Sequence, residues 1–133
     1  MSDLVLDASA AIRLTLGHPD TDGGVFDSLE SADRVLAPRL FFSEVGNALW
    51  KYVRAGGLTE ADALERLREA KSLVGSTVDD AELIEEALVA AVRFDHPVYD
   101  ALYAVLARRR NCAVVTVDRR LRSLLATMRI DSV

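Results

Sequence analysis

The sequence has a single cysteine, Cys112, among its 133 residues. One cysteine excludes an internal disulfide and any cysteine-rich zinc site, and the apolar neighbours of Cys112 predict a small buried side chain. No apolar stretch approaches the roughly 18 residues that a membrane-spanning helix needs. The N-terminal segment also lacks the basic start and long apolar core of a secretory signal. We therefore expect a cytoplasmic protein that does not enter a membrane.

Internal repeats, low-complexity tracts and proline- or serine-rich linkers are absent as well. A chain of this length has one domain's worth of residues, and one core can bury roughly two-thirds of the surface of the unfolded chain. The sequence therefore predicts a single domain over residues 1–133.

The net charge is −5, whereas a protein that binds phosphate groups usually has a basic surface. This total hides a division along the chain. Residues 1–95 carry 9 Lys or Arg against 18 Asp or Glu, while residues 96–133 carry 7 Arg against 3 Asp. Carboxylates that bind a metal ion would also repel a polyanion less than their formal charge suggests. The acidic total therefore does not exclude RNA as a partner.

Strand and helix patterns alternate along the chain, which is typical of an α/β domain. Helices are predicted at residues 8–16, 25–31, 39–54, 60–71, 79–94, 98–109 and 118–126. Strands are predicted at residues 4–6, 34–37, 76–78 and 113–117, with an edge strand at Ile130. The expected architecture is a four- to five-stranded, mostly parallel sheet flanked by helices. Ligands of such sheets bind at the carboxyl ends of strands, where the strand order reverses.

Asp7 and Asp118 each follow a predicted strand and precede a predicted helix. Taken singly, each is equally well explained as an N-cap that accepts hydrogen bonds from free backbone amides. Two such residues at matching positions favour a site, because neighbouring parallel strands would place both side chains on one edge of the sheet.

Asp100 precedes a helix in which residues 101–107 carry no charge on any face. A helix that is apolar all round is normally buried, and a carboxylate buried with it needs a cation or hydrogen-bond donors. The alternative is an aspartate that serves only the first turn of its own helix. Glu44 lies at the edge of the apolar stripe of the 39–54 helix, where a glutamate is usually solvated.

A cluster of these four carboxylates would repel itself without a cation. Mg²⁺ prefers hard oxygen ligands, and carboxylate-bound metal pairs can generate hydroxide and stabilise the departing oxygen in phosphodiester hydrolysis. The four acids together therefore indicate metal-assisted hydrolysis.

Four segments in order along the chain resemble the PIN-domain ribonucleases, and within them the VapC toxins of type II toxin–antitoxin pairs. The segments are VLDAS at 5–9, SEVGNAL at 43–49, YDALY at 99–103 and VTVDRRL at 115–121. The resemblance covers nearly the whole chain and implies a PIN-like fold.

The resemblance implies a catalytic set of Asp7, Glu44, Asp100 and Asp118. Of these, Asp7, Asp100 and Asp118 would hold Mg²⁺, or Mn²⁺ in its place. Supporting roles would fall to Ser9, Asn47 and Thr116. The implied activity is hydrolysis of RNA, often tRNA or ribosomal RNA. The implied partners are a VapB-type antitoxin and a second copy of the chain.

Arg119 and Arg120 follow Asp118 directly, which makes them candidates for RNA contact. The run 108–110 ends a helix, where arginines either meet the helix dipole or contact phosphate. Trp50 is expected in the core or at an interface. His18 and His96 lack the spacing of metal ligands and are expected to be structural or exposed.

Two other functions remain open beside the toxin, namely a housekeeping PIN ribonuclease and a non-catalytic binding module on the same fold. Phosphoacceptor domains also place acids at strand ends. Receiver domains need an acidic pair after the first strand and a lysine after a late one, and dehalogenase-type phosphatases need a second aspartate where this chain has Ser9. The chain lacks both patterns.

Overall fold

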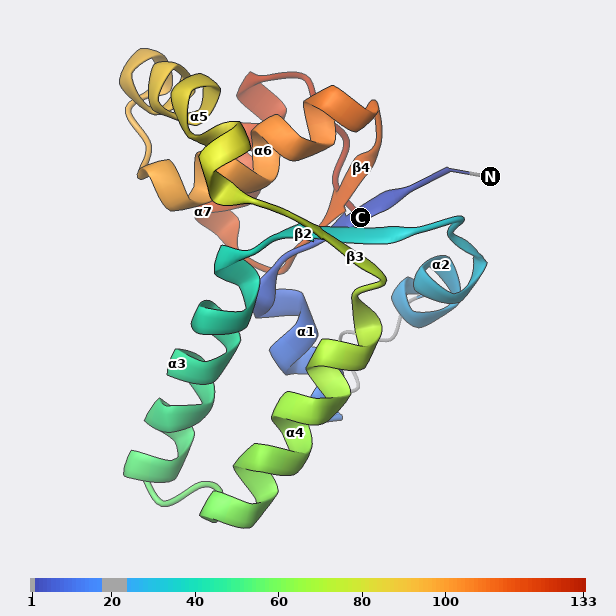
Figure 1. Cartoon of the computed structure of the whole chain (residues 1–133), viewed down its shortest axis with the longest axis vertical. Helices are drawn as coiled ribbons and strands as arrows, with labels where there is room; N and C mark the ends of the chain where they lie inside the picture. The colour runs from blue at the N-terminus through green and yellow to red at the C-terminus, as the bar shows by residue number, and fades with distance from the viewer. Residues whose placement is uncertain (1, 18–23) are drawn as a thin grey trace.

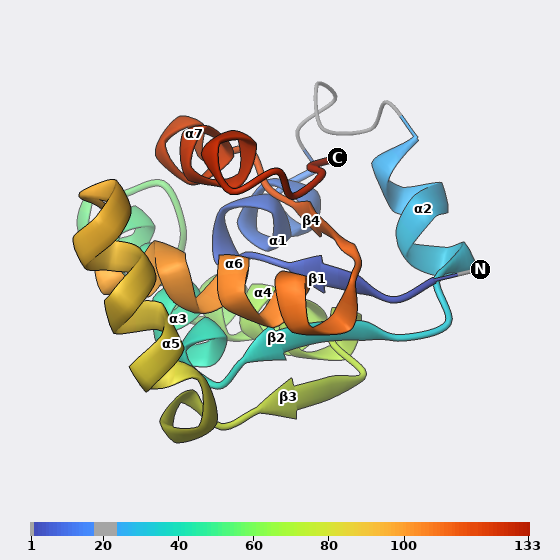
Figure 2. The ribbon, with the colours of Figure 1, turned by 90° about the horizontal axis from the view of Figure 1, so that it is seen from above.

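A four-stranded sheet lies at the centre of the computed structural model, which describes residues 2–17 and 24–133. Its strands are β1 (Leu4–Leu6), β2 (Val35–Pro38), β3 (Ser76–Val78) and β4 (Ala113–Val115). They run parallel in the order β3-β2-β1-β4, as Figure 2 shows from above. The predicted α/β class and mostly parallel sheet are confirmed.

Helices cover both faces of this sheet. In chain order they are α1 (Ala8–Thr15), α2 (Val25–Ser31), α3 (Leu40–Arg54), α4 (Glu60–Leu73), α5 (Asp80–Phe94), α6 (Val98–Arg110) and α7 (Arg119–Thr127). In Figure 1, α5, α6 and α7 lie above the sheet and α1, α3 and α4 lie below it. None of the helices in residues 2–17 and 24–133 is both long and apolar enough to cross a membrane.

Strands β1, β2 and β4 are largely buried, whereas β3 is mostly exposed. The side chains of the buried strands alternate between two hydrophobic cores, one on each face of the sheet. Val5, with neighbours from β2 and β4, packs against α5, α6 and α7. Leu4 and Leu6 point the other way and pack with α1 and α3. Residues 101–107 of α6 are all buried, as their lack of charge predicts. The buried middle of α6 therefore fixes the position of Asp100, which lies in the first turn of the helix.

The C-terminal part of the sheet is smaller than predicted. Strand β4 ends at Val115 rather than at residue 117, because the backbone amide of Val117 instead donates to the Ser9 hydroxyl. The edge strand predicted at Ile130 is wrong. Only an isolated parallel bridge between Val114 and Ser132 forms there.

Two side chains are less buried than predicted. Trp50 is 52% exposed, so of its two predicted places the core is excluded and an interface stays a prediction. The guanidinium of Arg54 lies 4.5 Å from the centre of its ring. Cys112 is only partly buried. His18, for which no metal role was expected, lies outside the described residues, whereas His96 is partly buried just before α6.

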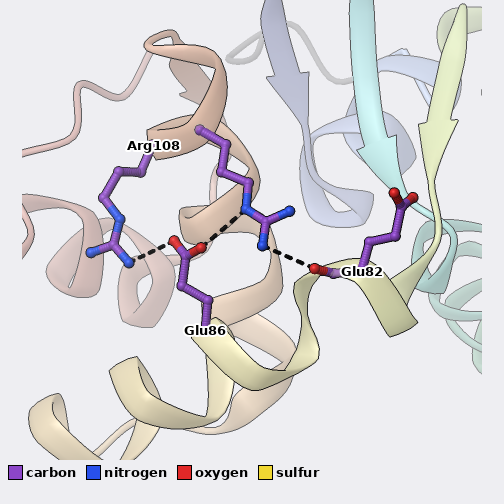
Figure 3. Close-up of polar contacts among 4 residues, drawn as sticks. Glu82, Glu86 and Arg108 are labelled. Atoms are coloured by element: carbon purple, nitrogen blue, oxygen red, sulfur yellow. Dashed lines mark hydrogen bonds and ion pairs between the residues drawn. The ribbon is translucent and has the colours of Figure 1, made fainter.

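The arginines at the end of α6 form ion pairs that the sequence did not indicate. Arg108 and Arg109 both bind the carboxylate of Glu86 on α5, at 2.8 and 3.0 Å, and Arg109 also donates to the carbonyl oxygen of Glu82 (Figure 3). These arginines therefore join α6 to α5. The sequence analysis considered only the helix dipole and phosphate as their partners and did not predict this contact.

Candidate active site

Asp7 and Asp118 lie at the carboxyl ends of the neighbouring strands β1 and β4. The chain runs from β1 outward to β2 and β3, then crosses to β4 on the other side of β1, so the strand order reverses between β1 and β4. Parallel sheets place ligands at this point. The structure therefore brings the two aspartates to one edge of the sheet, as their matching positions predicted.

Asp7 is only 5% exposed and accepts hydrogen bonds on both carboxylate oxygens. Its Oδ1 accepts from the Ser9 hydroxyl at 2.7 Å and from the Ala10 amide at 3.0 Å. Its Oδ2 accepts from the Thr116 hydroxyl at 2.9 Å. The predicted N-cap role is thus present, but two side-chain hydroxyls hold the same carboxylate, which an N-cap alone does not require.

The hydroxyls of Ser9 and Thr116 also connect the two strand ends. The Ser9 hydroxyl accepts from the Val117 amide at 3.2 Å, and the Thr116 hydroxyl accepts from the Asp118 amide at 3.0 Å. Asp118 in turn caps α7 by accepting the amide of Arg120 at 2.8 Å. The positions of Asp7 and Asp118 are therefore fixed relative to one another through these hydroxyls.

Glu44 reaches the site from α3 and is held there by α6. Its Oε1 accepts a 2.6 Å hydrogen bond from the phenol of Tyr103. Tyr103 is buried, and burial together with the charge of Glu44 raises the pKa of its phenol, so the phenol stays protonated and donates. Glu44 is therefore not the solvated flank that its position at the edge of the stripe would usually indicate.

Asp100 has an oxygen that nothing in the described chain satisfies. Its Oδ2 is buried without a hydrogen-bond partner, and the cap of α6 at Pro97 receives no side-chain bond. The interpretation of Asp100 as a residue that serves its own helix turn is therefore not supported. A buried carboxylate oxygen without a donor is costly, and a cation in front of it would remove that cost.

A cleft of about 510 Å³ joins these side chains. Its walls include all four predicted acids together with Ser9 and Asn47, while Thr116 lies buried behind it. Two cations, Arg13 and Lys51, line it as well. Sequence reasoning missed them, although each lies four residues beyond a predicted site residue on the same helix, Arg13 after Ser9 and Lys51 after Asn47.

The cleft raises the pKa values of its acids. Burial raises the pKa of Asp7 from 3.8 to about 6, against the opposing effect of its hydrogen bonds, and the charge of Asp118 adds to it. Burial likewise raises the pKa values of Glu44 and Asp100, and repulsion from the neighbouring carboxylates adds to both. The site therefore concentrates negative charge, which an added cation would neutralise.

The donor set fits a hard divalent cation, because carboxylate oxygens are what Mg²⁺ and Mn²⁺ prefer. Within residues 2–17 and 24–133, no three acidic, histidine or cysteine side chains lie close enough together to hold one ion directly. Water molecules or side-chain rotation would have to complete such a site.

Arg119 and Arg120 lie exposed in the first turn of α7 and do not line the cleft. Arg120 is nevertheless close enough to lower the pKa of Asp100 against the effect of burial. His96 acts on Asp100 in the same direction.

Comparison with known proteins identifies the family. The model of the PIN domain matches residues 4–124. The chain is 32% identical to ribonuclease VapC9 of Mycobacterium tuberculosis, over 89% of this chain and 87% of that protein. It is also 32% identical to ribonuclease VapC3 of Pyrobaculum aerophilum, over 89% and 91% of the two chains.

Solved structures share the fold. PAE2754 from Pyrobaculum aerophilum superposes with a TM-score of 0.74 at 28% identity, covering 92% of this chain and 84% of that one. VapC20 of M. tuberculosis, a sarcin-ricin loop cleaving toxin, gives 0.68 at 18% identity, covering 90% and 93%. VapBC2 of Rickettsia felis, bound to a DNA fragment from its promoter, gives 0.66 at 12% identity, covering 98% and 97%. The chain therefore belongs to the PIN-domain family and, within it, to the VapC type of nuclease toxins.

Proposed function

We propose that the protein is a metal-dependent endoribonuclease that acts as the toxin of a VapBC-type toxin–antitoxin pair. The observation that carries this proposal is the cleft in which Asp7, Glu44, Asp100 and Asp118 meet. One domain over residues 1–133 would hold the whole site. The identity to ribonucleases VapC9 and VapC3 over 89% of the chain supports RNA as the substrate.

Asp7, Asp100 and Asp118 would hold Mg²⁺ or Mn²⁺. When bound, such an ion supplies a water of lowered pKa and charge stabilisation for a phosphodiester. The unpartnered Oδ2 of Asp100 and the raised pKa of Asp7 support this assignment, because both are relieved by a positive charge.

The other side chains would position these ligands and handle the proton. Ser9 and Thr116 hold Asp7 so that its carboxylate keeps one orientation. Tyr103 occupies Oε1 of Glu44, which leaves Oε2 for a water molecule in the cleft. The raised pKa of Glu44 suits a group that takes a proton from the attacking water. Asn47 lies on the cleft wall, one helical turn from Glu44, where it can orient the substrate.

The proposed partners follow from the same relatives. VapC20 cleaves the sarcin-ricin loop, as its name states, and this supports structured ribosomal RNA, beside tRNA, as the target class. VapBC2 is a toxin with its antitoxin, which supports a VapB-type antitoxin here. We also propose a homodimer, and the cytoplasm as the place of action.

The proposal is tested by RNA cleavage and by growth. The purified protein should cut RNA with Mg²⁺ or Mn²⁺ and stop when the ion is chelated. Its induction should arrest bacterial growth, and the product of the preceding gene should restore growth. Sequencing RNA ends after induction would identify the target.

Three outcomes would separate the candidates. Cleavage without growth arrest would favour a housekeeping ribonuclease. Binding of RNA without cleavage under any divalent ion would favour a non-catalytic module. If the protein neither binds nor cleaves RNA, RNA is excluded as its substrate.

Arg13 and Lys51 line the cleft together with the acids and should bind the RNA backbone. We expect Lys51→Ala to weaken RNA binding and to lower the slope of log affinity against log salt by roughly 1, since one phosphate contact is lost. Fluorescence anisotropy on an Asp7→Asn background measures binding without cleavage. Arg68→Ala is the matched control, because Arg68 is exposed on α4 and does not line the cleft. Equal salt slopes for both variants would contradict this assignment.

A further inference from the structure

The cleft changes its chemical character along its length. Its acids lie near the carboxyl end of the sheet, whereas Arg13, Lys51 and Tyr52 lie further along α1 and α3, which pack side by side (Figure 1). Glu44 and Tyr52 are eight residues apart on α3, which corresponds to about 12 Å along the helix axis. The proposed function uses the acids and the two cations but gives no role to the ring of Tyr52.

Tyr52 presents an aromatic ring to the cleft. It is 39% exposed, and it lines the cleft together with the apolar side chains of Ile12 and Ala48. Tyr103 also lines the cleft, but it is buried and its phenol is bound to Glu44. The ring of Tyr52 is therefore accessible to a ligand, whereas Tyr103 holds a carboxylate in place.

The turn between α3 and α4 lies beside this ring. The backbone amide of Gly57 donates to the carbonyl oxygen of Tyr52 at 2.8 Å, and a β-carbon at Gly57 would lie 3.6 Å from Cδ1 of the ring. This contact limits the movement of the ring. A side chain that is already ordered loses less conformational entropy when a ligand covers it.

Arg13 and Lys51 supply positive charge beside the ring. Both side chains are exposed, and neither forms an ion pair within residues 2–17 and 24–133. Proteins that bind single strands combine such cations, which contact phosphates, with aromatic rings on which bases stack. A base inside a duplex is already stacked and paired, so it does not offer its face to a side chain. The charges and the ring together therefore fit an unpaired nucleotide.

We propose that Tyr52 forms a base-binding subsite of the cleft, in which its ring stacks on an unpaired base. The distance from Glu44 assigns this base to a nucleotide beside the one whose phosphate the acids hold. The inference rests on the proposed function, and it names the substrate as RNA that is unpaired at this position. Every base has a π-face, so the subsite selects unpaired nucleotides and not a particular sequence.

Two short synthetic RNA strands of equal length test this subsite. One consists of adenosine nucleotides, and the other has the same ribose-phosphate backbone without bases. On the Asp7→Asn background, Tyr52→Ala should weaken binding of the adenosine strand by about 5-fold or more, as loss of one stacked base does, and should leave binding of the abasic strand nearly unchanged. Tyr52→Phe keeps the ring and should keep the affinity for both strands. Fluorescence anisotropy measures each affinity.

Trp50→Ala is the matched control. Trp50 is a second exposed aromatic residue of α3, but it lines the apolar groove between α3 and α4 and not the cleft. Its loss should leave the affinity for both strands unchanged, and circular dichroism confirms that each variant folds.

The outcomes separate the subsite from the proposed function. If Tyr52→Ala weakened binding of both strands equally, or if Tyr52→Phe lost as much affinity as Tyr52→Ala, base stacking on the ring would be overturned. Binding of RNA that Tyr52→Ala leaves unchanged would overturn the subsite alone. A protein that binds neither strand would overturn the subsite together with the proposed RNA substrate.

Discussion

The Asp7→Asn variant is expected to cleave RNA at least about 100-fold more slowly than the wild type and to keep its fold. Loss of an outer partner of a metal site costs about 10- to 100-fold in activity, and Asp7 is one of the residues proposed to hold the ion. The asparagine oxygen can still accept from the Ala10 amide and the Ser9 hydroxyl. The variant therefore removes the negative charge with little change of shape, and initial cleavage rates with Mg²⁺ measure the effect.

Asp3→Asn is the matched control for this experiment. Asp3 directly precedes β1, the strand that Asp7 follows. Asp3 pairs with Arg34 at 3.1 Å and does not line the cleft. Its replacement should change cleavage by less than about twofold, as for a surface ion pair. Asp100→Asn should behave like Asp7→Asn. Wild-type rates in both cleft variants would remove the acidic centre from the mechanism.

The fold was predictable from the sequence because its signals are local. Short apolar runs mark β1 and β4, and the lack of charge in residues 101–107 marks a buried α6. The helix predicted to begin at residue 60 does begin there, because the Thr59 side chain caps it by accepting the Asp62 amide at 3.1 Å. A cap or a run of buried residues depends on a few neighbours in sequence, so single-sequence reasoning locates it.

The contacts that build the site are not local, and these were missed. Tyr103 and Glu44 are 59 residues apart, and nothing in an otherwise apolar helix indicates that its phenol will meet a carboxylate. The early end of β4 has the same origin, because Ser9 from the other strand captures the Val117 amide. Arg108 was likewise described only relative to its own helix, whereas its partner is Glu86 on α5.

The positions of the four acids were predictable to different degrees. Asp7 and Asp118 followed from strand ends, and the position of Asp100 followed from its buried helix. The prediction that Glu44 belongs to the site depended on the family resemblance. Its position at the edge of an apolar stripe does not reveal whether the side chain faces open solvent or a cleft. What all four do in the reaction stays a prediction until the variants are measured.

Without divalent cations, the wild type should lose stability relative to Asp7→Asn as the pH rises from about 4 to about 6. The folded protein raises the pKa of Asp7 from 3.8 to about 6, so it binds this proton more tightly than the unfolded chain does. The stabilisation is complete below pH 3.8, falls between the two values and is lost above pH 6. A shift of about two pKa units corresponds to about 3 kcal/mol in the free energy of unfolding.

Urea denaturation in the presence of a chelator, at intervals from pH 4 to pH 7, measures this difference. Glu44 and Asp100 also have raised pKa values, but both variants retain them, so most of their contribution cancels in the comparison. Adding Mn²⁺ above pH 6 should stabilise the wild type and leave Asp7→Asn nearly unchanged, because a ligand that binds only the folded state raises its stability. If the difference in unfolding free energy between the two proteins stayed constant with pH, the fold would not raise the pKa of Asp7, and this prediction would be wrong.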